Sequence, residues 1–315
     1  MAITIADRRA RAPREPRRPA TVQARREARA AHLFMLPWFL GVIIISLGPI
    51  VASAVLSFMK YRLVGSATWV GLDNYARMFS DERLAQSLKV TFVYVLFGVP
   101  LTLALALLLA VVLNRGVAGL SIYRSVYYLP SLFGGSVAVG VLWRQVFGAD
   151  GIVNTFLGWF GIESTKSWVG SPDSALWTLI ILHVWTFGSS MIIFLAGLRQ
   201  IPAELYEAAS LDGASAWQQF TRVTFPILTP IVFFNLVMGV INSFQNFAQA
   251  FVVSGGSGGP TDSTLVYALY LYQQAFGPTR DMGYASALGW LLVFIVGGLT
   301  AVNFALSRRW VHYDN

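Results

Sequence analysis

Cysteine is absent from this chain of 315 residues, and charged side chains are scarce. The lack of cysteine excludes disulfides, iron–sulfur clusters and thiol catalysis. Only 12% of the residues are charged, against about 25% in soluble domains. Hydrophobic residues make up 56%, and the mean hydropathy is +0.60. A soluble domain would still need a charged surface, so the composition indicates that lipid covers much of this chain.

Motifs for metal binding and catalysis are also missing. The histidines His32, His183 and His312 are far apart in sequence and form no metal motif. A P-loop ends in Gly-Lys-Ser/Thr, but no lysine here follows a glycine, so the chain does not hydrolyse ATP by that route. Residues 255–259 fit the G-x-S-x-G pattern of hydrolases, but they follow an apolar stretch and precede Pro260, which favours a flexible loop. We therefore expect a protein that is not an enzyme and holds no metal or cofactor of its own.

Six apolar stretches are long enough to cross a membrane, which takes about 20 mostly apolar residues. They are Leu33–Phe58, Leu88–Leu113, Ile122–Phe147, Leu176–Leu198, Ile227–Val253 and Tyr284–Leu306. The first stretch could be a cleaved signal peptide, but its charged leader and its apolar run are both too long, which favours a retained span. The sequence therefore predicts an all-α, polytopic membrane protein with six transmembrane helices.

Positive charge is concentrated before the first span, where nine of the 20 arginines lie. This run could bind nucleic acid, but a disordered cytoplasmic tail beside anionic headgroups is favoured, so we expect membrane lipid and no nucleic acid as its partner. The positive-inside rule then places both termini in the cytoplasm. The predicted organisation is a leader at 1–32, a six-span domain at 33–307 with a cytoplasmic loop at 199–226, and a cytoplasmic tail at 308–315.

The middle of the predicted spans contains no Asp, Glu or Lys. Arg124 and Arg144 lie near the ends of the third span, where their side chains can snorkel. Proton-coupled transporters and voltage sensors usually need ionisable groups at mid-membrane, whereas sodium-coupled carriers can use backbone carbonyls. Energy for transport is therefore expected to enter from outside the spans.

Residues 199–226, between the fourth and fifth predicted spans, have the pattern of two short helices joined by a turn. Pro202 suits a first helical position, and Glu204 and Glu207 lie in the early turns, where carboxylates favour a helix N-terminus. By itself this pattern fits either a generic amphipathic hairpin or a docking element.

The turn and the second helix have signals of their own. Gly213 after Asp212 is typical of a helix end, because glycine takes the left-handed conformation without strain. Ser215 and Gln218 form a capping box that opens the second helix. Pro226 is then expected to break the chain before the fifth span.

The same segment resembles the EAA loop of ABC importer permeases, whose pattern is EAA, three residues, Gly, nine residues and Ile-x-Leu-Pro. Here Glu207-Ala208-Ala209 is followed at that spacing by Gly213 and by Val223-Thr224-Phe225-Pro226, with Val for Ile and Phe for Leu. The wider string IPAELYEAASLDGASAWQQF resembles the carbohydrate-uptake branch, and the stretch from GYASALGW to SRRWVHYD resembles the larger subunit of maltose permeases. The Arg-rich leader lies outside this resemblance.

The resemblance implies a type I ABC importer permease core, which forms half of the path for a sugar or related polyol across the cytoplasmic membrane of a prokaryote. The implied partners are a second related permease chain, two cytoplasmic ATPase subunits that bind ATP and magnesium, and an extracytoplasmic solute-binding protein. The EAA loop would couple the permease to the ATPase. Its implied coupling residues are Glu207, Ala208, Ala209, Asp212, Gly213 and Pro226.

A path for a sugar should be lined by polar and aromatic groups. Candidates in the fourth and fifth spans are His183, Thr186, Ser190, Asn242, Gln245, Asn246 and Gln249. The last four follow at steps that place them on one face of a helix. His183, Thr186, Ser190 and Gln245 also align at or near positions that touch sugar in the maltose permease. Their alternative role is hydrogen bonding between helices, worth about 0.6–2 kcal/mol per pair.

Two other functions stay open. The first is a permease of the same machinery for glycerol 3-phosphate or another small solute, although a phosphate ester would favour an arginine in the path and none is well placed in mid-span. The second is a secondary carrier that needs no ATPase, which would leave the EAA loop unexplained.

Overall fold

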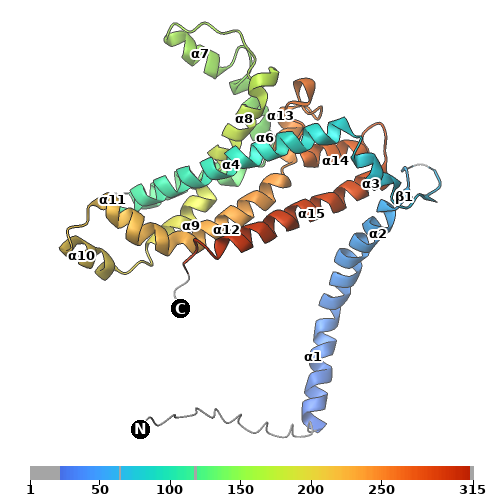
Figure 1. Cartoon of the computed structure of the whole chain (residues 1–315), viewed down its shortest axis with the longest axis horizontal. Coiled ribbons are helices and arrows are strands. Elements are labelled where there is room, and N and C mark those ends of the chain that lie inside the picture. Colours follow the sequence, from blue (N-terminus) through green and yellow to red (C-terminus); the bar gives the residue numbers. More distant parts are fainter. Residues whose placement is uncertain (1–21, 64, 117–118, 313–315) are drawn as a thin grey trace, which may run out of the picture. The chain divides into compact units, whose positions relative to one another are not determined.

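The computed structural model describes residues 22–63, 65–116 and 119–312, and its side chains from residue 30 onward (Figure 1). The chain divides into two compact units, residues 1–52 and 53–315. Part of the predicted leader, residues 1–21, and the end of the predicted tail, residues 313–315, lie outside the described residues.

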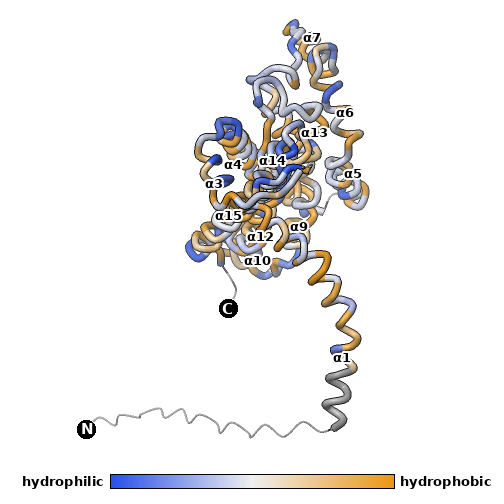
Figure 2. Tube along the Cα trace, turned by 90° about the vertical axis from the view of Figure 1, so that its right-hand side faces the viewer, coloured by the Kyte–Doolittle hydropathy of each residue, from blue (hydrophilic) through white to orange (hydrophobic). Residues whose placement is uncertain are grey.

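The described part of the first unit, residues 22–52, belongs to one long helix that ends at Ser57. Helix α1 (Val22–Gly41) continues through a π-helical segment, η1 (Val42–Leu47), into α2 (Gly48–Ser57). Because α1 begins at Val22, residues 22–32 of the predicted leader are helical rather than disordered. In Figure 2 the coloured part of this helix is mostly orange, which marks hydrophobic residues, and none of its most apolar window is buried. This helix is the first predicted span.

Near its start the second unit contains a short antiparallel pair of strands, in which Met59 pairs with Trp69. Its elements are β1 (Met59–Lys60), β2 (Thr68–Trp69), α3 (Asp73–Met78), α4 (Glu82–Asn114), α5 (Leu120–Phe133), α6 (Val137–Val146), α7 (Ile152–Trp159), α8 (Pro172–Trp185), α9 (Gly188–Leu198), α10 (Ala203–Leu211), α11 (Ala216–Gln219), η2 (Phe220–Thr224), α12 (Phe225–Phe244), α13 (Ala248–Val253), η3 (Pro260–Asp262), α14 (Tyr267–Phe276) and α15 (Met282–Ser307).

Six spans result when each bent pair of helices is taken as one span. Four described helices are long and apolar enough to cross a membrane alone. The pair α5 and α6 bends by 98°, and the pair α8 and α9 bends by 40°. The prediction of six spans therefore agrees with the structure, but the third and fourth are not continuous helices. In the third span the break falls at Gly134 and Gly135, after which Ser136 caps α6 by accepting a hydrogen bond from the amide of Val139 (3.3 Å).

The fifth span differs from the prediction in two ways. Helix α12 ends at Phe244, and residues 245–247 are not helical before α13 begins, so the four polar residues of this region do not share one face of one helix. At its other end the helix is continuous from Ala216 to Phe244, so Pro226 does not break it. The π-helical segment η2 lies just before Pro226, and its wider turn accommodates the proline ring and the missing N–H.

Helix α4 lies at the centre of the second unit and packs against α8, α9 and α12. One end of the core gathers Tyr94, Leu179, Phe244, Tyr270 and Leu288. The other end gathers Ala106, Ala110, Met191, Phe194 and Leu228. The two alanines are fully buried, and side chains of this size let helices approach closely within a membrane.

A half-buried carboxylate, that of Asp81, fixes the start of α4. Asp81 accepts a hydrogen bond from the backbone amide of Leu84 (3.1 Å) and others from the hydroxyls of Tyr270 and Tyr284. Although burial raises it, the pKa of the Asp81 carboxyl stays below its usual value because the two tyrosine hydroxyls stabilise the charged form. One side chain thus connects α4 to α14 and α15.

Candidate functional site

The loop between the fourth and fifth spans ends its first helix as the sequence predicts. Gly213 has a φ of +76°, in the left-handed region. The amide of Ala214 donates to the carbonyl of Ala209 (2.9 Å), and the amide of Gly213 donates to that of Ser210 (3.0 Å). These two bonds form a Schellman motif, which satisfies the last carbonyls of α10. At the other end of α10, Pro202 is the residue before the helix rather than its first member.

Side chains brace the two helices of this loop against each other. The predicted capping box of Ser215 and Gln218 is present. The side-chain amide of Gln219 donates to the hydroxyl of Ser210 (3.0 Å), and the hydroxyls of Tyr206 and Thr224 are hydrogen-bonded at 2.9 Å. These contacts join α10 to α11 and to the start of the fifth span, so a force on α10 passes directly to that span.

The outer surface of the loop combines charge with exposed apolar groups. Glu207 and Ala208 are exposed, and so is Asp212. Leu211 is 89% exposed and Trp217 is 72% exposed. Large apolar groups left bare beside a carboxylate are typical of a surface that docks another protein.

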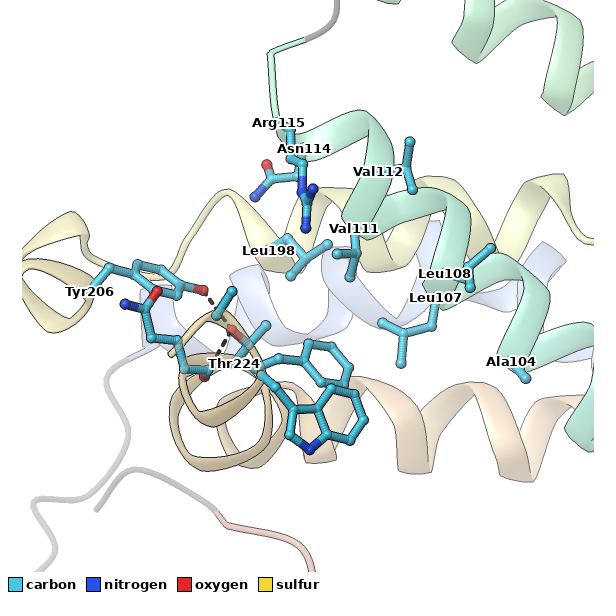
Figure 3. A pocket seen from close by; sticks show the side chains of 14 residues that line it. Ala104, Leu107, Leu108, Val111, Val112, Asn114, Arg115, Leu198, Tyr206 and Thr224 are labelled. Carbon is cyan, nitrogen blue, oxygen red and sulfur yellow. Dashed lines mark hydrogen bonds between the residues drawn. The ribbon is translucent and has the colours of Figure 1, made fainter. Parts of the chain in front are cut away.

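An apolar cavity of about 950 Å³ lies between this loop and the end of α4 (Figure 3). Its lining residues are Ala104, Leu107, Leu108, Val111, Val112, Asn114, Arg115, Leu198, Tyr206, Ala216, Trp217, Gln219, Phe220 and Thr224. The Tyr206–Thr224 hydrogen bond crosses one wall of it. None of the predicted path residues lines this cavity, and its mostly apolar wall does not suit a sugar.

A second cavity, of about 390 Å³, does gather predicted path residues; we call it the polar cavity. It is lined by Tyr94, Gly135, His183, Asn242, Ser243, Gln245, Asn246, Phe247, Ala248 and Gln249. His183, Asn242, Gln245, Asn246 and Gln249 were candidates from the sequence, whereas the candidates Thr186 and Ser190 are not part of this lining. The cavity forms where α12 gives way to α13, because the break turns the polar side chains toward one space.

The polar side chains in this cavity fall into two groups. The amide of Asn246 donates to the hydroxyl of Tyr94 (2.8 Å), and the hydroxyl of Ser243 lies 3.5 Å from Nε2 of His183. Within the described part of the chain, the exposed side-chain amides of Asn242 and Gln245 make no hydrogen bond. These two amides are therefore free to bind a solute.

The helix breaks of the third, fourth and fifth spans are joined by side chains. The hydroxyl of Ser131 donates to the carbonyl of Thr186 (2.9 Å) and accepts from the amide of Ser189 (3.0 Å). The amide of Gln249 donates to the carbonyl of Gly134 (2.9 Å). In lipid, irregular backbone is tolerated only where protein or a cavity satisfies its polar groups. The breaks therefore depend on one another.

Two lining residues with polar side chains were missed by the sequence analysis. Tyr94 comes from the second span. Its hydroxyl could have indicated a contact with another polar residue, because buried tyrosines usually find a hydrogen-bond partner. Ser243 directly follows Asn242, so a search of the polar stretch could have included it. Thr186, a predicted candidate, donates its hydroxyl to the carbonyl of His183 (2.7 Å), and Ser190 is half-buried in α9. Contact of either with a solute stays a prediction.

Comparison with known proteins agrees with this architecture. Residues 76–311 match the family described as "Binding-protein-dependent transport system inner membrane component". The chain belongs to this family. It is thus a multi-pass permease, a transport component. The resemblance of residues 199–226 to the EAA loop of ABC importer permeases agrees with this family.

Relatives of this permease cover nearly its whole length. It is 51% identical over 292 residues to the probable ABC transporter permease protein YesP of Bacillus subtilis (strain 168), covering 92% of this chain and 94% of that protein. It is 32% identical to the lactose transport system permease protein LacF of Rhizobium radiobacter, covering 88% of this chain and 93% of that one.

A solved structure shares its fold. A chain of a bacterial alginate ABC transporter, crystallised in complex with an alginate pentasaccharide-bound periplasmic protein, matches with a TM-score of 0.75 at 21% identity. The match covers 91% of this chain and 96% of that one. At this identity the likeness shows the fold alone, and the assignment to a permease family rests on the match over residues 76–311.

Proposed function

We propose that this permease forms half of the translocation path for an uncharged sugar or polyol in an ATP-driven importer. It pairs with a second, related permease chain and with two ATPase subunits, and a solute-binding protein delivers the solute. Both termini lie in the cytoplasm. The observation that carries this proposal is the polar cavity at the break of the fifth span, where two uncharged amides are unpaired.

The chemistry of the polar cavity favours a neutral solute. Its lining contains amides, a hydroxyl, a phenol and one imidazole, and it contains no Asp, Glu, Lys or Arg. Hydroxyl groups of a sugar can donate to the amide oxygens and accept from the amide nitrogens of Asn242 and Gln245. The fully buried ring of Tyr94 packs 5.3 Å from that of His183 and supports the imidazole of this lining. A phosphate ester or a uronate would lack a cation to pair with on this half of the path.

The 199–226 loop supplies the connection to ATP hydrolysis in this proposal. Glu207, Leu211 and Trp217 form the docking surface, and the bond between Tyr206 and Thr224 transmits its movement to the fifth span. That span carries the polar cavity at its other end. A closure of the ATPase pair would then tilt one continuous helix, Ala216–Phe244, and reshape the cavity.

Reconstitution in liposomes tests the proposal. The permease is purified with its partner permease, the ATPase subunits and the solute-binding protein, and uptake of radiolabelled lactose, glycerol 3-phosphate and an alginate oligosaccharide is compared. We expect ATP-dependent uptake of a neutral saccharide or polyol and none of the two anions.

Two results would overturn different parts of the proposal. ATP-dependent uptake of an anion alone would remove the neutral solute but keep the importer. Uptake by the isolated chain without ATP or partners would make it a secondary carrier.

A further inference from the structure

Residues 148–167, between the third and fourth spans, fold back on themselves and carry the short helix α7, which lies beyond the end of α8 in Figure 1. The two ends of the segment meet, because the amide of Trp168 donates to the carbonyl of Phe147 (3.0 Å). Since it connects these two spans, it lies at the opposite end of the fourth span from the 199–226 loop. We call it the α7 segment.

One buried asparagine holds the α7 segment in shape. The amide nitrogen of Asn154 donates to the carbonyls of Ala149 (2.7 Å) and Lys166 (2.9 Å). Its amide oxygen accepts from the indole N–H of Trp168 (2.7 Å). Asn154 thus holds one face of α7 against the rest of the segment. The opposite face of the helix therefore points outward.

The outer face of α7 is apolar and bare. Ile152 is 71% exposed and Trp159 is 78% exposed. Phe160, just after the helix, is 69% exposed, and its ring meets that of Phe156 edge to face. Residues 151–162 contain no charged side chain. The nearest charges flank this stretch at Asp150 and Glu163.

Several observations select lipid as the covering of this face. The family is one of inner membrane components, and the adjoining spans also expose apolar side chains, such as Leu142 on α6 and Ile181 on α8. The hydrogen bond between Trp168 and Phe147 closes the neck of the segment and keeps α7 near the ends of these spans. Spans that cross the hydrocarbon end near the headgroups. Trp and Phe on an uncharged face are typical of helices that lie in this zone. A soluble partner that dissociates in each transport cycle would leave the apolar face of α7 exposed to water, which is unfavourable. The membrane, in contrast, covers it at all times.

From this arrangement we propose that α7 lies flat in the membrane–water interface on the side opposite the 199–226 loop, with Ile152, Phe156, Trp159 and Phe160 inserted among the lipid headgroups and upper acyl chains. Lys166 lies beside the neck, with its ammonium 5.3 Å from the ring of Trp168, where it can meet lipid phosphates. The α7 segment then fixes the depth and tilt of the third and fourth spans. This inference does not depend on which solute is carried.

The absence of cysteine makes a direct test simple, because a single cysteine can be introduced without removing others. Phe156→Cys and Trp159→Cys are compared with Thr165→Cys, an exposed polar position in the same segment. Each variant is assembled with its partner chains, labelled with a nitroxide and placed in liposomes of phosphatidylethanolamine and phosphatidylglycerol. Retained ATP-dependent uptake confirms that the variants fold.

The measurement is the collision rate of each nitroxide with oxygen, which concentrates in lipid, and with a nickel chelate, which stays in water. We expect a ratio of oxygen to nickel collisions several-fold higher at positions 156 and 159 than at 165. Equal ratios at all three positions would show that α7 projects into water. Low rates with both reagents at 156 and 159 would show that protein covers the face. Either result overturns the proposal.

Discussion

The side-chain amide of Gln249 donates a 2.9 Å hydrogen bond to the carbonyl of Gly134 and thereby joins the break of the fifth span to that of the third. Gln249→Leu removes the donor and leaves an apolar side chain that is one atom shorter. Because the carbonyl would be left unpaired inside the protein, we expect a loss of about 1–3 kcal/mol in stability. The measurement is the midpoint of thermal unfolding of the purified complex.

The matched control for this variant is Gln145→Leu on α6. Gln145 is exposed, and its side chain makes no hydrogen bond within the described part of the chain. A decrease in the midpoint for Gln249→Leu alone is expected. The same midpoint for both variants would contradict a structural role for the bond between Gln249 and Gly134.

Gln245→Ala should weaken solute uptake and leave assembly intact. The unpaired amide of Gln245 lines the polar cavity, and one hydrogen bond to a hydroxyl is worth about 0.5–1.5 kcal/mol, or roughly a 2- to 12-fold rise in the half-saturating concentration. Asn235→Ala on α12 is the control, because Asn235 is buried and bonds to the carbonyl of Ile231 (2.9 Å) outside this cavity. Unchanged uptake kinetics with loss of the complex would make Gln245 a packing residue.

Glu207→Ala should weaken coupling more than folding. Glu207 is exposed on α10, away from the spans, so membrane insertion should continue normally. We expect lower substrate-stimulated ATPase activity of the purified complex at an unchanged expression level. Glu204→Ala, which changes an exposed carboxylate in the first turn of the same helix, should have a smaller effect. Normal stimulation and uptake in Glu207→Ala would rule out its coupling role.

Gly213→Val should be worse than Gly213→Asn. A Cβ at this position would meet no atom within 4 Å, so the cost comes from the left-handed backbone alone. Asparagine tolerates that region better than a β-branched residue, for which the cost is on the order of 1–3 kcal/mol. Co-purification of the ATPase at matched permease levels should decrease in the order wild type, Asn, Val. Equal retention would mean that the turn does not set the geometry of the docking surface.

The sequence by itself determined those features that depend on a few neighbouring residues or on total hydrophobicity. The six apolar stretches were recognisable because crossing the hydrocarbon requires length and low charge, whatever the partners of each helix. The left-handed turn at Gly213 and the capping box of Ser215 and Gln218 were predictable because their hydrogen bonds join residues close together in the chain. The EAA spacing indicated the family for the same reason.

Tertiary structure decided where the spans break and which side chains meet. Hydropathy counts apolar residues but does not show the path of the backbone, so the bends in the third and fourth spans and the end of α12 at Phe244 were not foreseen. These breaks are stabilised by contacts between distant residues, such as Ser131 with Thr186 and Gln249 with Gly134. The polar cavity forms around such a break and draws Tyr94 from the second span to Asn246 in the fifth, because unpaired polar groups in a membrane must find their partners on other helices.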